Sequence, residues 1–125
     1  MSYRSPLGRA RGLGSAKEGV HHFWMQRVTA VALIPLVLWF VYSVAQLPNG
    51  SYEAVHWWVH APSVAVALVL FLACALYHSM LGVQVVIEDY VAGDGSKIVA
   101  LLVSKFAHII AAVAGVFAVL KIALT

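Results

Sequence analysis

The sequence predicts an all-α membrane protein with three transmembrane helices, a cytoplasmic N-terminus and a periplasmic C-terminus. Of its 125 residues, 62% are hydrophobic and only 10% are charged. A soluble domain is nearer half apolar and a quarter charged, so this chain has too little polar material to cover a surface that faces water. Three long apolar runs give the number of helices, and the positions of lysine and arginine give their orientation.

The first apolar run extends from about residue 23 to residue 46 and carries no charge after Arg27. It ends at the sequence Leu47-Pro48-Asn49-Gly50-Ser51. Asn-Gly favours a turn with positive φ, so the first helix is expected to stop there. We therefore divide the chain into an N-terminal arm of residues 1–22 and a three-helix anchor domain of residues 23–125.

The second run extends from about residue 62 to 87, and the third from about residue 98 to 124. A helix that crosses ~30 Å of hydrocarbon needs roughly 20 residues, so all three runs are long enough. Pro62 suits the first position of its helix, because its missing N–H is not needed there. Lys105 interrupts the third run, and its side chain must reach the membrane surface or face protein.

Most of the basic residues lie near the N-terminus. Five of the eight lysine and arginine residues are Arg4, Arg9, Arg11, Lys17 and Arg27. The loop of residues 47–61 has none. Because loops rich in lysine and arginine stay in the cytoplasm, the N-terminus is predicted to be cytoplasmic and, after three crossings, the C-terminus periplasmic. The same asymmetry accounts for the net charge of +3, so no nucleic-acid partner is predicted.

A histidine lies deep in the second apolar run. The residues before His78, from Ala61 to Tyr77, include no charged residue. An ionisable group is expensive in hydrocarbon, so His78 is a candidate functional residue, and a neutral imidazole there suits ligation of haem iron. Cys74 and Gly82 lie one helical turn before and after it, and such small neighbours favour a flat recess for a porphyrin. The alternative is a histidine hydrogen-bonded across a helix interface, where small residues merely allow close packing.

An acidic step and a tyrosine close the second helix. Tyr90 follows His78 by twelve residues, or ~18 Å along a helix, which places His78 near mid-depth and Tyr90 at the cytoplasmic surface. Its phenol could donate to a carbonyl oxygen, and Asp89 or Glu88 could relay protons. The alternative is an interfacial tyrosine beside a solvated acidic turn.

Two further residues have open roles. Arg27, beside His21, is either a topology anchor or a counter-charge for an anionic group such as a haem propionate. His108 lies ~15 Å along the third helix, close to the level of His78, and spacing alone allows it to be a second ligand. The sequence contains no zinc-type spacing, nucleophile motif or glycine-rich phosphate loop, so the chain is expected to be non-catalytic by itself.

Two motifs resemble those of the hydrophobic membrane-anchor subunit of bacterial succinate dehydrogenase, the D subunit or cytochrome b556 anchor of respiratory complex II. One is Gly19-Val20-His21-His22-Phe23 followed by Arg27, Thr29 and Ala30. The other is His78 and Gly82 followed by Asp89-Tyr90-Val91. The resemblance covers about residue 14 to the end, although the family pattern has an aspartate where this chain has His22.

This resemblance implies a specific set of roles. His78 is expected to be an axial ligand of a haem b whose second axial histidine comes from a sister cytochrome b556 anchor subunit, so His108 is not expected to be a ligand. Tyr90, with Asp89, is expected to bind ubiquinone. Arg27 and His21 are the candidates for the haem propionates.

The implied protein is a multi-pass subunit of the bacterial inner membrane, in contact with lipid. It docks a flavoprotein subunit and an iron–sulfur subunit on the cytoplasmic face, and electrons from succinate reach ubiquinone in a site that it shares. The alternatives are an anchor of a fumarate reductase, which runs in the reverse direction, and a non-redox membrane scaffold.

Overall fold

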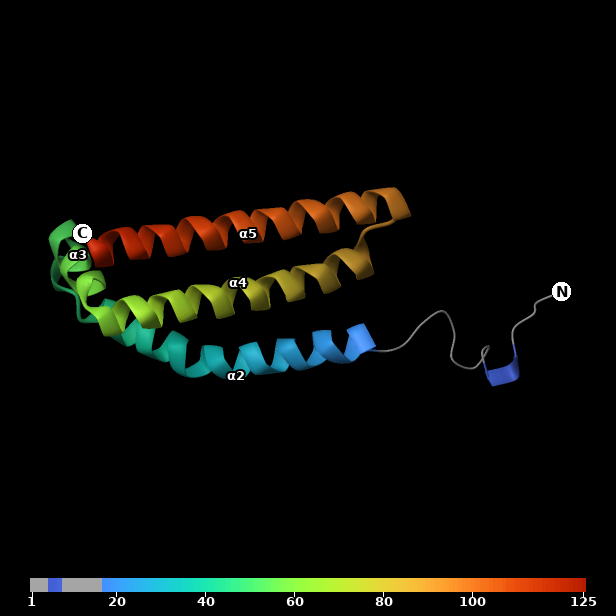
Figure 1. The fold of residues 1–125 in the computed structure, drawn as a ribbon, viewed down its shortest axis with the longest axis horizontal. Helices are drawn as coiled ribbons and strands as arrows, with labels where there is room; N and C mark the ends of the chain where they lie inside the picture. Colours follow the sequence, from blue (N-terminus) through green and yellow to red (C-terminus); the bar gives the residue numbers. More distant parts are fainter. Residues whose placement is uncertain (1–4, 8–16) are drawn as a thin grey trace.

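The computed structural model describes residues 5–7 and 17–125, and this part of the chain is helical without strands. Three long helices dominate it: α2 (Lys17–Ala45), α4 (Pro62–Tyr90) and α5 (Asp94–Leu124). Each contains a segment long and apolar enough to cross a membrane. A short 3-10 helix, η1 (Pro48–Gly50), and the helix α3 (Tyr52–His60) connect α2 to α4 (Figure 1). The predicted all-α architecture with three membrane-spanning helices is confirmed.

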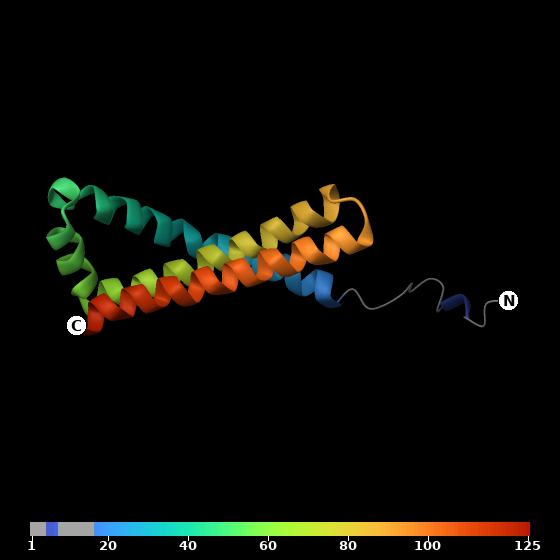
Figure 2. The same ribbon diagram turned by 90° about the horizontal axis from the view of Figure 1, so that it is seen from above.

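Helix α4 lies between α2 and α5 and packs against both (Figure 1). Seen from above, α2 crosses the α4–α5 pair at an angle (Figure 2). The start of α2 and the turn between α4 and α5 lie at one end of the molecule, whereas α3 and the C-terminus lie at the other. The start of α2 and the acidic step at Tyr90 therefore share an end.

The long helices extend beyond their apolar runs. Helix α2 begins at Lys17 rather than near residue 23, α4 continues to Tyr90, and α5 begins at Asp94. Backbone hydrogen bonds hold a helix together whatever its side chains, so an apolar run marks the membrane-embedded part and not the ends of the helix. Of the predicted N-terminal arm, residues 1–4 and 8–16 lie outside the described part of the chain.

The connections follow from local chemistry. Asn49 and Gly50 both have a φ of 56°, which confirms the predicted turn, and Gly93 has a φ of 86° before α5. Pro62 occupies the first turn of α4, as predicted. The sequence did not predict α3, although Ser51 marks its start: the Ser51 hydroxyl caps the helix by accepting a hydrogen bond from the backbone N–H of Ala54.

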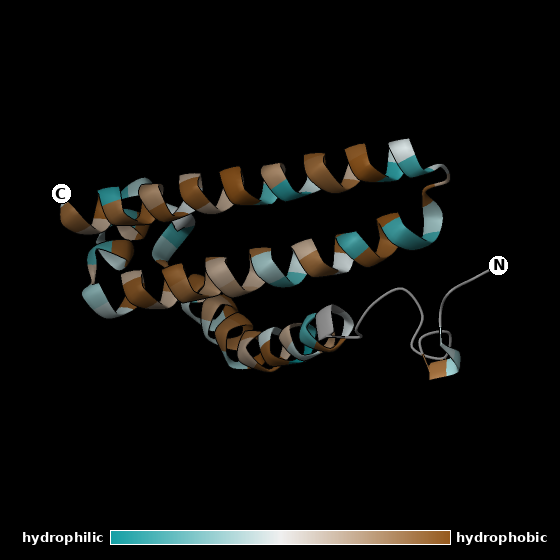
Figure 3. Ribbon diagram, turned by 45° about the vertical axis from the view of Figure 1, so that its right-hand side comes forward, coloured by the Kyte–Doolittle hydropathy of each residue, from teal (hydrophilic) through white to brown (hydrophobic). Residues whose placement is uncertain are grey.

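Hydrophobic residues predominate along the three long helices (Figure 3), and many large ones are exposed. The best-buried hydrophobic residues of the described chain are few, namely Val59, Ala65, Leu68, Leu81 and Ile87. The most apolar segment of α5 has no buried residue. In water this much exposed apolar surface would be strongly unfavourable, so lipid or other protein chains must cover it. The helices approach closely where they touch: a Cβ atom at Gly115 of α5 would lie 3.1 Å from Leu72 of α4.

Candidate functional site

A hydrogen bond joins His78 of α4 to Thr29 of α2. The Oγ1 atom of Thr29 lies 3.0 Å from Nδ1 of His78. Thr29 is 5% exposed and is the buried polar side chain of the described core. The imidazole of His78 is half-buried at this contact. The structure therefore places the candidate ligand where α2 and α4 meet.

A cavity with three polar residues in its lining, called the polar cavity below, lies one helical turn from His78. Its volume is about 480 Å³, and Gly82 of α4 lines it together with Phe23, Gln26 and Arg27 of α2. The Arg27 guanidinium lies 5.1 Å from the centre of the Phe23 ring, a cation–π contact that holds it at this wall. Because residues four apart share a face of a helix, Gly82 leaves open space on the same face of α4 as His78.

Two buried polar atoms at this cavity have no hydrogen-bond partner. Among the described residues, they are Nε2 of His22 and Oε1 of Gln26, both from residues that line the cavity. Buried polar groups are normally hydrogen-bonded, so such orphaned atoms call for a partner that binds there. The cavity thus combines a cation, an unpaired imidazole nitrogen and an unpaired amide oxygen.

Two further cavities lie on other sides of α4. One, of about 600 Å³, is lined by His21, His22 and Lys105 among others. The Lys105 side chain is thus at a protein cavity, one of the two outcomes predicted for it. His21 and Arg27 line different cavities, and His22 lines both. The two candidate propionate residues are therefore not brought together.

The other cavity, of about 530 Å³, is almost wholly apolar and lies among all three long helices. Cys74, Thr29 and His108 line it. The small neighbours of His78 therefore face different spaces, since Cys74 lines this apolar cavity whereas Gly82 lines the polar one. His78 is not among the lining residues of either.

Both ring nitrogens of His108 have protein partners. Its Nδ1 lies 2.7 Å from the backbone oxygen of Ser104, an acceptor, so Nδ1 carries the proton and donates it. Its Nε2 lies 3.1 Å from Oγ of Ser79 on α4 and accepts a hydrogen bond from that hydroxyl. His108 therefore links α5 to α4 and has no free nitrogen for a metal.

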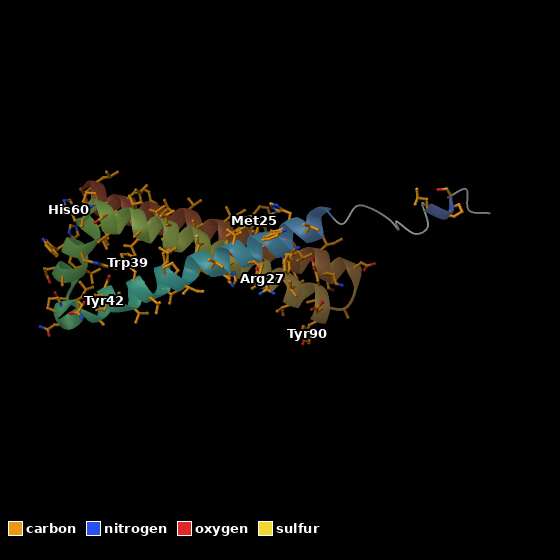
Figure 4. The ribbon with its side chains drawn as sticks, turned by 90° about the horizontal axis from the view of Figure 1, so that it is seen from below. Met25, Arg27, Trp39, Tyr42, His60 and Tyr90 are labelled. Carbon is orange, nitrogen blue, oxygen red and sulfur yellow. The ribbon has the colours of Figure 1, made fainter. Side chains whose placement is uncertain are left out.

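The acidic step and Tyr90 form the exposed end of α4. Tyr90 is 84% exposed, and its side chain points away from the helices (Figure 4). The side-chain amide of Gln84 donates to Glu88 across 2.9 Å, while Asp89 is exposed beside it. A quinone site at Tyr90 would need walls from another chain.

Within the described residues, no three His, Cys, Asp or Glu side chains gather to hold a metal ion. A metal at His78 would therefore take its other ligands from a prosthetic group or from a partner chain. Sequence reasoning included Thr29 in a motif but gave it no role, because its partner is 49 residues away along the chain.

The fold and this arrangement define a class: a small three-helix membrane protein with polar groups where its first and central long helices meet. The chain belongs to the family of succinate dehydrogenase/fumarate reductase transmembrane subunits, whose family model matches residues 1–120. This membership confirms the predicted family. It also agrees, together with the three apolar helices, with the predicted location as a multi-pass protein of the bacterial inner membrane.

Relatives agree over most of the chain. A succinate dehydrogenase hydrophobic membrane anchor subunit of Rickettsia bellii is 34% identical over 117 residues, which cover 94% of each chain. One of Paracoccus denitrificans is 36% identical over 97 residues, or 78% of this chain and 75% of the relative. A succinate dehydrogenase membrane anchor subunit of Reclinomonas americana is 29% identical over 92 residues. No solved structure matches the chain.

Proposed function

We propose that this chain is the membrane anchor of a succinate:ubiquinone oxidoreductase. In this role it supplies one axial ligand of a haem b, from His78, and part of a ubiquinone site, from Tyr90 and Asp89. Family membership supports the anchor role, and the names of the relatives, which are succinate dehydrogenase subunits, support the direction from succinate. One observation carries the haem assignment: a polar cavity with orphaned buried atoms lies one turn from a histidine in the middle of an apolar helix.

The residues present fit a haem b. His78 supplies an imidazole at mid-helix, and the absent side chain of Gly82 leaves room on the same face of α4. Arg27 supplies a guanidinium for one propionate through charge-assisted hydrogen bonds, and the unpaired Nε2 of His22 lies at the same cavity. His21, at the neighbouring cavity, is the candidate for the second propionate. A bound haem supplies one-electron redox chemistry, and this chain supplies ligation and charge.

The proposed quinone site lies at the end of α4. The Tyr90 phenol donates a hydrogen bond to a quinone carbonyl oxygen, and the exposed Asp89 carboxylate beside it takes up protons from water and passes them to the reduced quinone. Both side chains are exposed, which leaves them available to a ligand and to a second chain that encloses it. His78 and Tyr90 are ~18 Å apart along α4, so the proposed haem and quinone lie at different depths in the membrane.

We place the Tyr90 end of the molecule in the cytoplasm. The start of α2, which follows the basic N-terminal residues, lies at this end, and lysine and arginine are retained on the cytoplasmic side (Figure 1). The flavoprotein and iron–sulfur subunits then dock at this end. The sister anchor subunit covers an exposed apolar face and brings the second axial histidine, and lipid covers the rest.

A reduced-minus-oxidised optical spectrum of the purified complex tests this function. The proposal predicts a sharp b-type α-band and ubiquinone among the extracted quinones. A complex without haem would contradict the haem role and favour a non-redox scaffold. A b-type spectrum with menaquinone and preferred fumarate reduction would instead identify a fumarate reductase anchor, the other activity named for this family.

A further inference from the structure

The hydroxyl of Thr29 has three neighbours but only one proton. Its Oγ1 lies 2.6 Å from the backbone oxygen of Met25, 3.2 Å from that of Gln26 and 3.0 Å from Nδ1 of His78 (Met25 is labelled in Figure 4). The two carbonyl oxygens can only accept hydrogen bonds. The proton therefore points toward the carbonyl oxygens, and mainly toward Met25, which is the nearer.

The same reasoning fixes the proton on the imidazole. If Thr29 donated to His78 instead, its oxygen would face the Met25 oxygen at 2.6 Å with no proton between them, a repulsive arrangement. Oγ1 must therefore accept from His78, and Nδ1 carries the N–H. A neutral imidazole has one protonated nitrogen, so Nε2 keeps its lone pair.

We propose that Thr29 is a positioning residue, which holds His78 with its proton on Nδ1 and thereby leaves Nε2 free to ligate the haem iron. This inference deepens the proposed function and rests on it. A histidine that ligates a metal normally donates its other N–H to an acceptor, which fixes the ring orientation and makes the ligating nitrogen more basic. Here the acceptor is a neutral hydroxyl, itself held by α2 through Met25 and Gln26.

The burial of Thr29 supports this role. It is 5% exposed, and the cavity beside it is almost wholly apolar, so water is a poor replacement for its hydroxyl if the side chain is changed. Losing the bond would leave the Nδ1 proton of His78 without an acceptor at a helix interface. The ring could then rotate, and a less basic Nε2 would stabilise ferric iron less.

The test uses the intact complex with Thr29→Val, which keeps the shape of the side chain and removes the hydroxyl. Thr29→Ser restores the hydroxyl, because serine can also bond the carbonyl four residues back. Ser79→Ala is the matched control: it removes another hydroxyl–imidazole bond between helices, next to His78 in sequence but made with His108. The readouts are haem loss to excess apomyoglobin, the haem midpoint potential and the ferric electron paramagnetic resonance spectrum.

Thr29→Val is expected to lose haem about 10- to 100-fold faster, as for other partners of metal-bound histidines, with a higher midpoint potential and a shifted ferric spectrum. Thr29→Ser and Ser79→Ala should behave like the unmodified complex. Thr29→Ala, which cannot crowd its neighbours, serves the same test if Thr29→Val fails to assemble.

The inference is overturned if haem loss and potential in the hydroxyl-free variant match the unmodified complex, or if Ser79→Ala changes them equally. A His78→Leu variant measured in parallel distinguishes failure of the proposed haem ligation from failure of the role of Thr29. If it keeps the unmodified haem spectrum, the proposed function itself fails; if it loses the haem while Thr29→Val is unaffected, only the role of Thr29 fails.

Discussion

The Ser79 hydroxyl on α4 donates a hydrogen bond to Nε2 of His108 on α5, across 3.1 Å. The preceding residue, His78, is bonded to Thr29 on α2. Two successive residues of the central helix thus link it to the helices on its two sides. Of the two histidines at similar depth, His108 has both ring nitrogens hydrogen-bonded to protein, whereas His78 is hydrogen-bonded to Thr29 through Nδ1.

The bonding of His108 predicts a structural role. His108→Ala should leave a low-spin bis-histidine haem spectrum intact, because the second ligand is expected from the sister subunit. The variant should be less stable by about 1–3 kcal/mol, because it loses two hydrogen bonds that each contribute about 0.5–1.5 kcal/mol. Optical spectra and thermal inactivation of the complex check both parts. A high-spin haem in this variant would show that the chain supplies both ligands.

Arg27 is predicted to bind a haem propionate. Arg27→Leu removes a charge-assisted hydrogen bond worth about 1.5–3 kcal/mol, so haem should be held roughly 10- to 150-fold more weakly. Lys121→Gln, which removes a positive charge in the last turn of α5, is the control. Haem transfer to apomyoglobin measures the effect. Equal haem retention in the two variants would mean that Arg27 only anchors the topology.

Tyr90 is predicted to hydrogen-bond a ubiquinone carbonyl. Tyr90→Phe keeps the ring and removes one hydrogen bond worth about 0.5–1.5 kcal/mol, so apparent quinone affinity should fall roughly 2- to 13-fold. Succinate oxidation by a soluble dye acceptor should survive, because that reaction bypasses the quinone. Tyr42→Phe is a matched control, since Tyr42 is 69% exposed but lies toward the α3 end (Figure 4). Unchanged ubiquinone kinetics in Tyr90→Phe would mean that Tyr90 is only an interfacial anchor.

The N-terminus is predicted to be cytoplasmic. A reporter protein that is active only in the cytoplasm should work when fused before residue 1, and one active only in the periplasm should work after Thr125. The opposite pattern of activity would reverse the orientation and move the proposed quinone site to the other face of the membrane.

The architecture could be predicted from sequence because apolar runs report directly on helices that cross a membrane. Helix α3 was missed because its nine residues lie in a loop, where Ser51 and Glu53 were the only cues to a helix start. The separation of Arg27 from His21 could have been predicted from helical geometry, since six residues turn a helix by about 600° and leave the two side chains roughly 120° apart around its axis. The hydrogen bond between Thr29 and His78 could not have been predicted, because no local sequence pattern indicates a contact between residues 49 apart in the chain.

The most direct test of the central claim, that His78 ligates a haem b, is the haem spectrum of the complex with His78→Leu beside that with His108→Ala. The account predicts that His78→Leu loses or shifts the low-spin b-type spectrum, while His108→Ala keeps it and both complexes still oxidise succinate with a soluble dye. An unchanged low-spin spectrum in His78→Leu would contradict the assignment of His78 and, with it, the haem role of this chain.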